Sequence, residues 1–271
     1  MQSIGGVLCL ETSNRSPVLH SAAMRRHRED WERFGAIEPY FAVLTDNRFR
    51  QKTLTSDSYR EFYETGERDV DRFLALVREA RGRPAKIRRA LDFGCGVGRV
   101  SIPLARHAAN VVGVDVSAAM LERAADAARS AEVPNIEFLS VDALATVDAS
   151  TFDLVVSYMV FQHIPPRDTE VYLEEIFRVA ASDAALVLHF SLSRSGGRAR
   201  RIMRSLRSRS RLIHRLVCFL RREEHFPYMQ MNEYNRVEIE RTLNGAGFEV
   251  RIVEPTDHGG IAGAIFVAVR G

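Results

Sequence analysis

Three glycines at alternate positions follow an acidic residue near residue 92, and no other stretch of the chain gathers so many residues suited to ligand binding. The segment reads Leu91, Asp92, Phe93, Gly94, Cys95, Gly96, Val97, Gly98 and Arg99, and an amphipathic segment, 100–107, follows it. Glycines leave the backbone open to a close ligand and permit the φ/ψ values of a tight turn. Backbone N–H groups at the start of a helix bind anionic or nucleotide-like ligands. The segment therefore predicts a strand, a ligand-binding turn and a helix.

Two aspartates end later strand-like segments, where such a ligand would need hydrogen-bond acceptors. Asp115 ends the apolar segment 110–115, 21 residues after Gly94, and Asp142 follows the segment 136–140. In an open parallel sheet, ligands bind outside the carboxyl ends of the strands. A carboxylate at Asp115 suits the two hydroxyls of a ribose, and one at Asp142 suits an adenine amino group. A lone aspartate at a strand end more often caps a turn, but three such features in succession favour a nucleotide-like site.

Apolar segments alternate with helical patterns along this part of the chain. The expected strands are 88–93, 110–115, 136–140, 152–158, 185–191, 248–253 and 261–269. Amphipathic periodicity predicts helices at 100–107, 117–131, 169–180 and 236–246. No helical pattern separates the last two strands, so they should pair as an antiparallel hairpin. The fold class is therefore α/β, with a seven-stranded mostly parallel sheet, helices on both faces and an antiparallel last strand.

The remaining segments are expected to cover this sheet domain. Residues 1–84 are predicted to form an N-terminal arm and helices, at 21–34 and 58–81, that cover the cleft. Gly66 interrupts the second helical pattern, as a kink or as a junction of two helices. Residues 85–271 are predicted to form the main domain, and the irregular insert 192–234 is predicted to be a helical substrate cover.

Four motifs, taken together, resemble those of the class I S-adenosylmethionine-dependent methyltransferases of the small-molecule type. They are the glycine segment 91–99, the strand end at Val114 and Asp115, the segment 141–143, and the strand 152–155. The resemblance covers residues 85–190 and implies a Rossmann-like fold. Dinucleotide-binding dehydrogenases usually carry Gly-x-Gly-x-x-Gly, whereas this chain has Gly-x-Gly-x-Gly after Asp92. The expected closing hairpin also favours a methyltransferase.

The resemblance implies S-adenosyl-L-methionine as cofactor and gives each motif a role. The glycines would line its methionine part, Asp92 would lie near its ammonium group, and Asp115 would hold the ribose. Asp142 and its neighbour would border the adenine. Cys95 would be a small neutral filler. The expected cofactor residues are Asp92, Gly94, Cys95, Gly96, Gly98, Asp115, Val116, Met120, Asp142, Ala143 and Tyr158.

The segment 157–165 follows a strand and should face the same cleft, which makes His163 the candidate catalytic base. Methyl transfer is an in-line displacement, so an enzyme must align donor and acceptor and remove the proton of a hydroxyl acceptor. His189 and His258 compete with His163 for that role, and each histidine could instead be structural. The expected substrate-binding residues are Tyr40, Gln162, His189, His225, Tyr228, Tyr234 and His258.

The insert contains eleven arginines and no acid between Arg194 and Arg222, with apolar residues near one helical face. Three interpretations stay open: a lid with solvated arginines, a surface for an anionic or membrane-associated substrate, and a nucleic-acid surface. The chain has 36 arginines and only two lysines, Lys52 and Lys86. Because that bias extends over the whole sequence, arginine content alone decides little.

Composition sets further limits. The chain has 271 residues, 46% of them hydrophobic, and a net charge of +3, which fits a soluble α/β protein. Its three cysteines form no Cys-x-x-Cys pair, so we expect neither a disulfide framework nor a metal site. No apolar run is long enough to span a membrane, and no secretory leader is evident. We expect a cytoplasmic location, and either a monomer or a homodimer.

The sequence favours methyl transfer to a hydroxyl of a small molecule, such as a sugar, glycolipid or other secondary metabolite. Several histidines are available as bases, and the Asn/Asp-Pro-Pro-Tyr signature of many amino-group methyltransferases is missing after the strand 152–158. The acceptor could be anionic or lipid-linked, with peripheral membrane contact. The alternative is an RNA or protein methyltransferase that docks its substrate on the arginine-rich insert. A non-catalytic scaffold is the third possibility.

Overall fold

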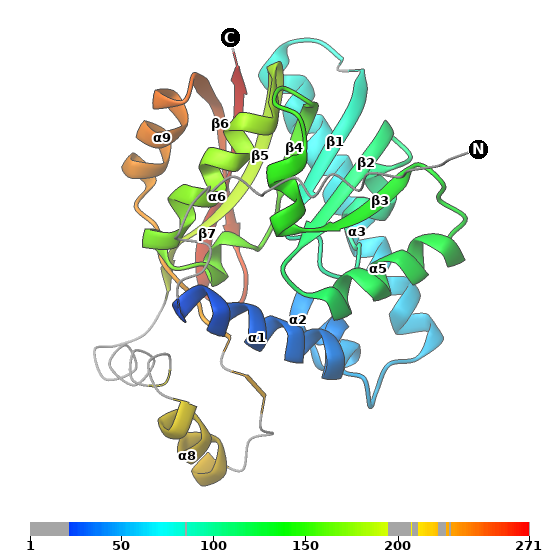
Figure 1. The fold of residues 1–271 in the computed structure, drawn as a ribbon, viewed down its shortest axis with the longest axis vertical. Helices are drawn as coiled ribbons and strands as arrows, with labels where there is room; N and C mark the ends of the chain where they lie inside the picture. Colours follow the sequence, from blue (N-terminus) through cyan, green and yellow to red (C-terminus); the bar gives the residue numbers. More distant parts are fainter. Residues whose placement is uncertain are drawn as a thin grey trace, which may run out of the picture.

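The computed structural model describes residues 22–84, 86–194, 207, 211–221, 226–227 and 229–270. Its seven-stranded sheet has the order β3-β2-β1-β4-β5-β7-β6 (Figure 1). The strands are β1 (Ile87–Phe93), β2 (Ala108–Asp115), β3 (Ile136–Ser140), β4 (Phe152–Ser157), β5 (Ala180–Arg194), β6 (Phe248–Asp257) and β7 (Ile261–Arg270). Strands β1 to β5 pair in parallel, and β7 runs antiparallel to both β5 and β6. The predicted α/β Rossmann-like fold and its closing hairpin are confirmed.

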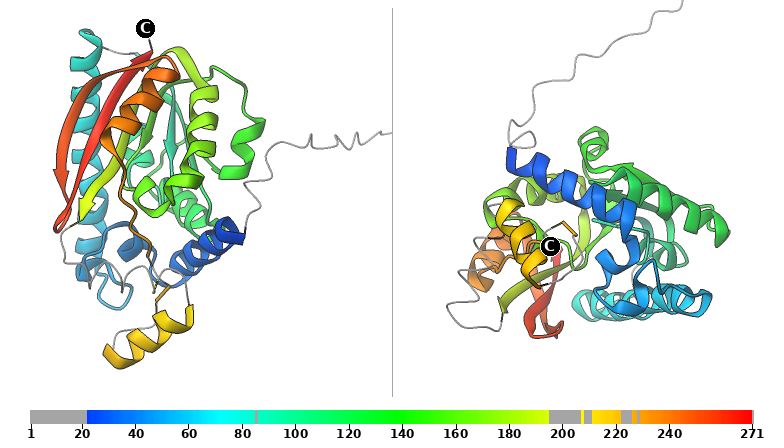
Figure 2. Two further views of the ribbon diagram at one scale, coloured as in Figure 1. Left: turned by 90° about the vertical axis from the view of Figure 1, so that its left-hand side faces the viewer. Right: turned by 90° about the horizontal axis from the view of Figure 1, so that it is seen from below.

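Helices cover both faces of the sheet because alternate residues of each buried strand point to opposite sides. On one face, α3 (Ser56–Arg81) and α4 (Ser101–Leu104) pack on strand residues such as Ala90 and Leu154. On the other face, α6 (Pro166–Val179) and α9 (Arg236–Gly245) pack on residues such as Leu91 and Leu186. The side view in Figure 2 separates these two layers. These helices do not cover the carboxyl ends of the parallel strands, where the N-terminal helices lie instead.

The N-terminal helices lie at these carboxyl ends (Figures 1 and 2). They are α1 (Ala22–Ile37), α2 (Pro39–Val43) and the short 3₁₀ helix η2 (Asn47–Phe49). Aromatic side chains join them to α3: the ring of Tyr40 meets that of Phe62 at 5.2 Å, and Phe49 meets Phe62 at 5.4 Å. Helix α1 also packs against α5 (Ala118–Ser130). The cover is thus an apolar cluster continuous with the main domain.

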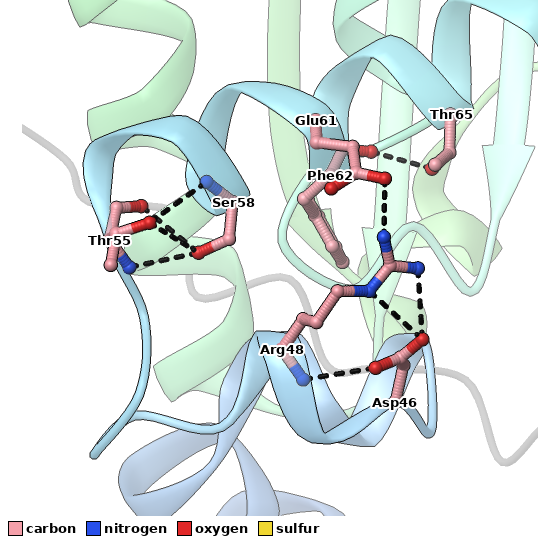
Figure 3. A network of polar contacts seen from close by, with 7 residues as sticks. All are labelled: Asp46, Arg48, Thr55, Ser58, Glu61, Phe62 and Thr65. Atoms are coloured by element: carbon pink, nitrogen blue, oxygen red, sulfur yellow. Dashed lines mark hydrogen bonds and ion pairs between the residues drawn. The ribbon is translucent and has the colours of Figure 1, made fainter.

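The start of α3 is fixed by a capping box and by an arginine (Figure 3). The Thr55 hydroxyl accepts from the Ser58 backbone N–H at 3.2 Å, and the Ser58 hydroxyl accepts from the Thr55 N–H at 2.8 Å. Arg48 of η2 donates to Asp46 at 2.9 Å and to Glu61 of α3 at 2.5 Å. Caps satisfy backbone donors that a helix start leaves unpaired. These contacts tie α3 to the loop that follows α2.

Helix α3 continues through Gly66, from Ser56 to Arg81. A Cβ atom at this position would lie 1.9 Å from the backbone oxygen of Arg99. Nearby, the Tyr63 hydroxyl donates to the Val97 carbonyl at 3.0 Å. Of the two predicted alternatives, the junction of two helices is therefore wrong, and a kink stays a prediction. The glycine is needed because α3 crosses the glycine turn at backbone contact distance.

Several elements differ in length from the expected ones, among them a helix and strand β5. The helix after the glycine turn spans only Ser101–Leu104, while β5 extends to Arg194 because it pairs with β7 from Ala185 to Arg194. Within the insert, the structure describes the helix α8 (Arg211–Arg221). The rest of the predicted helical substrate cover in 195–225, apart from residue 207, lies outside the described residues. The division of the chain at residues 84 and 85 stays a prediction.

Candidate active site

A cleft of about 870 Å³, which includes space open to solvent at its mouth, lies at the carboxyl ends of β1, β2 and β4 beneath α1 and α2. Sixteen of its lining residues come from the sheet end and the loops that follow the strands, and the others come from α1, α2, α5 and α6. Its lining includes His27, Trp31, Asp92, Gly94, Cys95, Gly96, Arg99, Asp115, Val116, Met120, Val141, Tyr158, Val160, His163 and Tyr172.

The glycine turn forms one wall of this cleft. Gly94, Gly96 and Gly98 have positive φ values of 78°, 54° and 80°, which residues with a Cβ adopt only with strain. The N–H groups of Gly94 and Cys95 donate to the Val114 carbonyl at 2.8 and 3.0 Å, which holds the turn against β2. Burial raises the pKa of the Cys95 thiol well above its usual value, so this side chain is a neutral thiol.

Asp115 organises the turn through its carboxylate. One oxygen accepts from the Gly96 N–H at 2.9 Å, and the other accepts from the Ser117 N–H at 2.9 Å. Burial raises the pKa of Asp115, while these backbone hydrogen bonds lower it. Each carboxylate oxygen retains a second lone pair. The residue can therefore accept further hydrogen bonds from a diol in the cleft.

Asp92 and Arg99 place opposite charges at one end of the cleft. The Ser101 hydroxyl donates to Asp92 at 2.5 Å, and burial raises the pKa of Asp92 to about 6 against the opposing effects of Ser101 and Arg99. Arg99 is buried and donates to Asp69 at 2.6 Å and to Thr65 at 3.1 Å. Its Nε is a buried donor without a hydrogen-bond partner. This end of the cleft suits a ligand that carries both an ammonium and a carboxylate.

The expected adenine residues divide into two groups. Val116 and Met120 line the cleft as predicted, together with Val141. Asp142 and Ala143, in the 3₁₀ helix η3 (Val141–Thr146), are not among the lining residues. The Asp142 carboxylate forms a two-bond ion pair with Arg28 of α1, at 2.7 and 2.8 Å. In this conformation Arg28 of α1 occupies the Asp142 carboxylate, which was predicted to accept a hydrogen bond from an adenine amino group.

His163 lines the cleft but is held in a hydrogen-bond chain. Its Nδ1 lies 2.7 Å from the Gln230 carbonyl, so Nδ1 carries the proton, and Nε2 accepts from the Gln162 amide at 3.1 Å. The Gln162 amide oxygen accepts from Ser191 at 3.0 Å. Burial lowers the pKa of His163 to about 4. His163 is therefore neutral, with its basic lone pair already in use.

Tyr158 joins the cleft to the two other candidate histidines. Its hydroxyl lies 3.4 Å from His258 Nε2, and its ring lies 5.2 Å from that of His189. His189 hydrogen-bonds Thr256 at 2.9 Å, and burial lowers its pKa to about 3. His258 is half-buried, with its pKa also lowered by burial. Neither histidine lines the cleft, so only Tyr158 of this group reaches it.

The remaining expected substrate residues support the cleft rather than line it. Tyr40 is buried in the aromatic cluster, and Gln162 is buried beside His163. The Tyr234 hydroxyl donates to the carbonyls of Phe161 or Ile164, at 2.9 and 2.6 Å. Gly98, an expected cofactor residue, is also not among the lining residues. His225 and Tyr228 lie outside the described residues.

The lining residues that were not expected as site residues include four with polar or aromatic side chains that bear on the chemistry: His27 and Trp31 of α1, Arg99, and Tyr172 of α6. The Trp31 and His163 rings meet edge to face at 4.9 Å, and the Trp31 indole donates to His27 at 3.0 Å. Only Arg99, directly after the glycine turn, carried a local signal in the sequence. The three others reach the cleft through tertiary packing.

Two further expectations concern metals and membrane spans. Among the described residues, no group of three or more His, Cys, Asp or Glu side chains could hold a metal ion. No helix in the described part of the chain is long and apolar enough to cross a membrane.

Comparison with known proteins relates the sheet side of this cleft to a known domain. A family model described as a methyltransferase domain matches residues 90–183. The chain is 37% identical over 84 residues to a ubiquinone biosynthesis O-methyltransferase of Paracidovorax citrulli. This match covers 30% of this chain and 35% of that protein. It is 32% identical over 105 residues to a 23S rRNA (uracil(1939)-C(5))-methyltransferase of Marinomonas sp., covering 38% and 23%. The matches span about a third or less of these relatives.

Solved structures extend the likeness over most of the chain. Magnesium protoporphyrin IX methyltransferase from Synechocystis PCC 6803, with bound SAH, aligns with a TM-score of 0.56 at 22% identity, covering 87% of this chain and 99% of that one. The same enzyme with bound SAM aligns with a TM-score of 0.55. The chain therefore carries a methyltransferase domain and has the fold of the class I S-adenosylmethionine-dependent methyltransferases.

Proposed function

We propose that the chain binds S-adenosyl-L-methionine in this cleft and transfers its methyl group to a hydroxyl of a small molecule. The carrying observation is the charge arrangement: Asp92 and Arg99 at one end, Asp115 beside the glycine turn, and an apolar wall beyond it. The cofactor is an amino acid joined to a nucleoside. Its ammonium suits Asp92, its carboxylate suits the unpaired Nε of Arg99, and its ribose hydroxyls suit Asp115.

Bound in this way, the cofactor would supply a methyl carbon activated by its positive sulfur. The chain's own task is to align the acceptor oxygen with that carbon, exclude water and take the hydroxyl proton as the O–C bond forms and the C–S bond breaks. The rings of Trp31 and His163 provide an apolar wall. Residues 1–84 and the insert 192–234 are proposed to cover this space.

Two proton acceptors are compatible with the geometry. His163 lines the cleft, but its Nε2 must first lose the hydrogen bond from Gln162. Tyr158 also lines the cleft and could pass its own proton to His258 Nε2, 3.4 Å away, as it receives one from the acceptor. We keep His163 as the first candidate because it faces the cleft directly.

Single variants separate these routes. If His163 is the base, His163→Ala should lower turnover about 10²–10⁴-fold while the Kd for S-adenosylhomocysteine hardly changes. Tyr158→Phe and His258→Ala should then have small effects on turnover. The reverse pattern would assign proton removal to Tyr158 and His258. An equal loss of cofactor affinity in His163→Ala would remove His163 from catalysis.

Calorimetry tests the cofactor assignment itself. Asp115→Asn leaves only one acceptor oxygen for two backbone N–H groups and a ribose, so S-adenosylhomocysteine should bind about 10- to 100-fold more weakly. Asp126→Asn removes an exposed carboxylate on α5, far from the lining, and is the matched control. If the unmodified chain fails to bind the cofactor, the proposed function is wrong and a non-catalytic scaffold remains.

The alternative function is RNA or protein methylation with docking on the arginine-rich insert. The likeness to an rRNA methyltransferase and the eleven arginines of 194–222 favour it. It predicts RNA binding that weakens steeply as salt rises, because each phosphate contact releases counterions. Absence of RNA binding at low salt would exclude the RNA form of this alternative. A screen of hydroxyl-bearing small molecules with methyl-labelled cofactor tests the favoured form.

A further inference from the structure

Helix α8 exposes a stripe of large apolar side chains. Leu212, Leu216, Phe219 and Leu220 are 76, 56, 79 and 69% exposed. They stand at i, i+4, i+7 and i+8, which places them on one side of the helix. We call these four residues the α8 stripe. In the described part of the chain, no other helix exposes so many large apolar residues; Ile37 and Val237 are the others.

The opposite side of α8 anchors the helix. His214 and Cys218 are buried, and His214 Nε2 donates to the Phe226 carbonyl at 2.8 Å. The Phe226 ring lies 6.2 Å from that of Phe41 in α2, and the Arg50 guanidinium lies 5.1 Å from the Phe226 ring. These contacts connect α8 to the helices that cover the cleft. Because the anchored side faces the protein, the α8 stripe faces away from it.

Helix α8 lies beyond α1 and α2, at the end of the molecule where the parallel strands finish (Figures 1 and 2). It stands apart from the sheet and from the helices on the two sheet faces. The α8 stripe therefore lies at the same end of the protein as the cleft, on its outermost element.

The charge of α8 complements a negative surface. The helix contains Arg211, Arg215 and Arg221 and no acidic residue, and the sequence 194–222 holds eleven arginines without an acid. An amphipathic helix with exposed Leu and Phe on one side and arginines beside them can lie in a membrane interface. Anionic lipid headgroups attract the arginines, and the acyl chains accept the apolar stripe.

We propose that α8 docks the protein on a bilayer surface containing anionic lipids, with the α8 stripe inserted among the acyl chains. A second copy of the chain is a poorer occupant, because a two-fold contact through α8 would bring two sets of arginines together. RNA is also a poorer occupant, since three of the four stripe residues are leucines, which neither pair with phosphates nor stack on bases. This docking does not depend on the methyl-transfer chemistry.

The test uses the full chain and sedimentation with phosphatidylcholine vesicles that contain or lack phosphatidylglycerol. We expect binding to the anionic vesicles and its weakening as salt rises. The double variant Leu216→Ser/Phe219→Ser should lower vesicle affinity at least about tenfold, because it removes the two central apolar side chains. Val237→Ser removes an exposed apolar residue of α9 and should bind vesicles like the unmodified chain. Arg215→Gln should lower affinity about fivefold.

Circular dichroism and S-adenosylhomocysteine binding show that each variant is folded, and they separate this proposal from the proposed function. Vesicle binding that disappears in a folded double variant supports the proposal even if the chain binds no cofactor. The proposal is wrong if the unmodified chain does not bind anionic vesicles. It is also wrong if the double variant binds vesicles normally, or if it changes only self-association or RNA binding.

Discussion

Arg28 of α1 donates hydrogen bonds to both carboxylate oxygens of Asp142, at 2.7 and 2.8 Å, next to the cleft where the cofactor is proposed to bind. The two side chains are 42 and 48% exposed, so the pair adds less than about 1 kcal/mol to stability. Its importance lies in position. The pair connects the N-terminal cover to the loop after β3, and it occupies the carboxylate that was predicted to accept a hydrogen bond from an adenine amino group.

Arg28→Ala should therefore change cofactor kinetics more than folding. With the ion pair gone, α1 opens more easily and Asp142 is free for the ligand, so the dissociation rate of S-adenosylhomocysteine should rise severalfold. Stopped-flow displacement measures that rate. Arg60→Ala breaks the exposed contacts of Arg60 with Asp57 and Glu64 on α3 and is the control, with no expected change. Identical rates in Arg28→Ala and the unmodified chain would deny α1 a gating role.

Cofactor affinity should rise with pH around the pKa of Asp92. Burial raises that pKa to about 6, and only the ionised carboxylate attracts an ammonium group. Between about pH 7 and about pH 5 the ionised fraction falls, so affinity should drop about tenfold. Calorimetry across this range measures the effect. Asp92→Asn should bind more weakly at neutral pH and show a flatter profile, whereas an unchanged profile would remove Asp92 from ligand binding.

Gly66→Ala should destabilise the protein although alanine is the better helix former. The new Cβ would meet the Arg99 carbonyl oxygen at 1.9 Å, so α3 or the glycine turn must move. We expect a loss of about 2–4 kcal/mol in the free energy of unfolding. Gly245→Ala, in α9, has open space around its Cβ position and should be neutral or stabilising by up to about 1 kcal/mol. Urea unfolding compares the two variants, and equal effects would contradict the backbone contact.

Stability should fall on acidification because of buried neutral histidines. Burial lowers the pKa values of His27 and His163 to about 4 and that of His189 to about 3. Below about pH 6.5 the unfolded chain protonates these imidazoles while the folded chain does not, so the free energy of unfolding decreases as pH falls. Each contributes on the order of 1–2 kcal/mol by about pH 5.

Asp92 acts in the opposite direction over this range. Its pKa is raised, so the folded chain binds its proton more tightly than the unfolded chain between about pH 4 and about pH 6. The loss of stability from the three histidines is larger than the gain from one aspartate, so the free energy of unfolding should still decrease as pH falls. Urea unfolding at several pH values measures the combined effect on the free energy of unfolding. In His189→Gln this free energy should decrease less between about pH 7 and about pH 5. A stability that is constant from about pH 7 to about pH 5 would contradict the neutral buried state of these histidines.

The sheet could be predicted from the sequence because its signals are local. Apolar segments, glycine spacing and acidic strand ends located β1 to β7 within a few residues, and the turn from Gly94 to Gly98 lies where its strand ends. Strand β5 was underestimated because its last residues are stabilised only by pairing with β7. The close contact of Gly66 could not be predicted for the same reason, since its partner is the backbone of Arg99.

The candidate site was predictable on the sheet side and not on the cover side. Asp92, Asp115, Tyr158 and His163 all line the cleft, because parallel strands bring their carboxyl ends together. The position of Trp31 in the cleft and the contact of Arg28 with Asp142 depend on how α1 packs on the carboxyl ends of the strands. The hydrophobic periodicity of the sequence does not predict that packing. The roles of these residues in binding and catalysis stay predictions until the variants are measured.

The hydrogen bonds from His163 Nε2 through the Gln162 amide to the Ser191 hydroxyl have two possible directions, while Nδ1–H donates to the Gln230 carbonyl in both. A second proton on the imidazole would set its Nε2–H against the amide N–H of Gln162. Half a turn of that amide presents its oxygen instead, and the hydroxyl of Ser191 can then accept where it previously donated. The protonation state of His163 is thus coupled to the orientation of one buried amide.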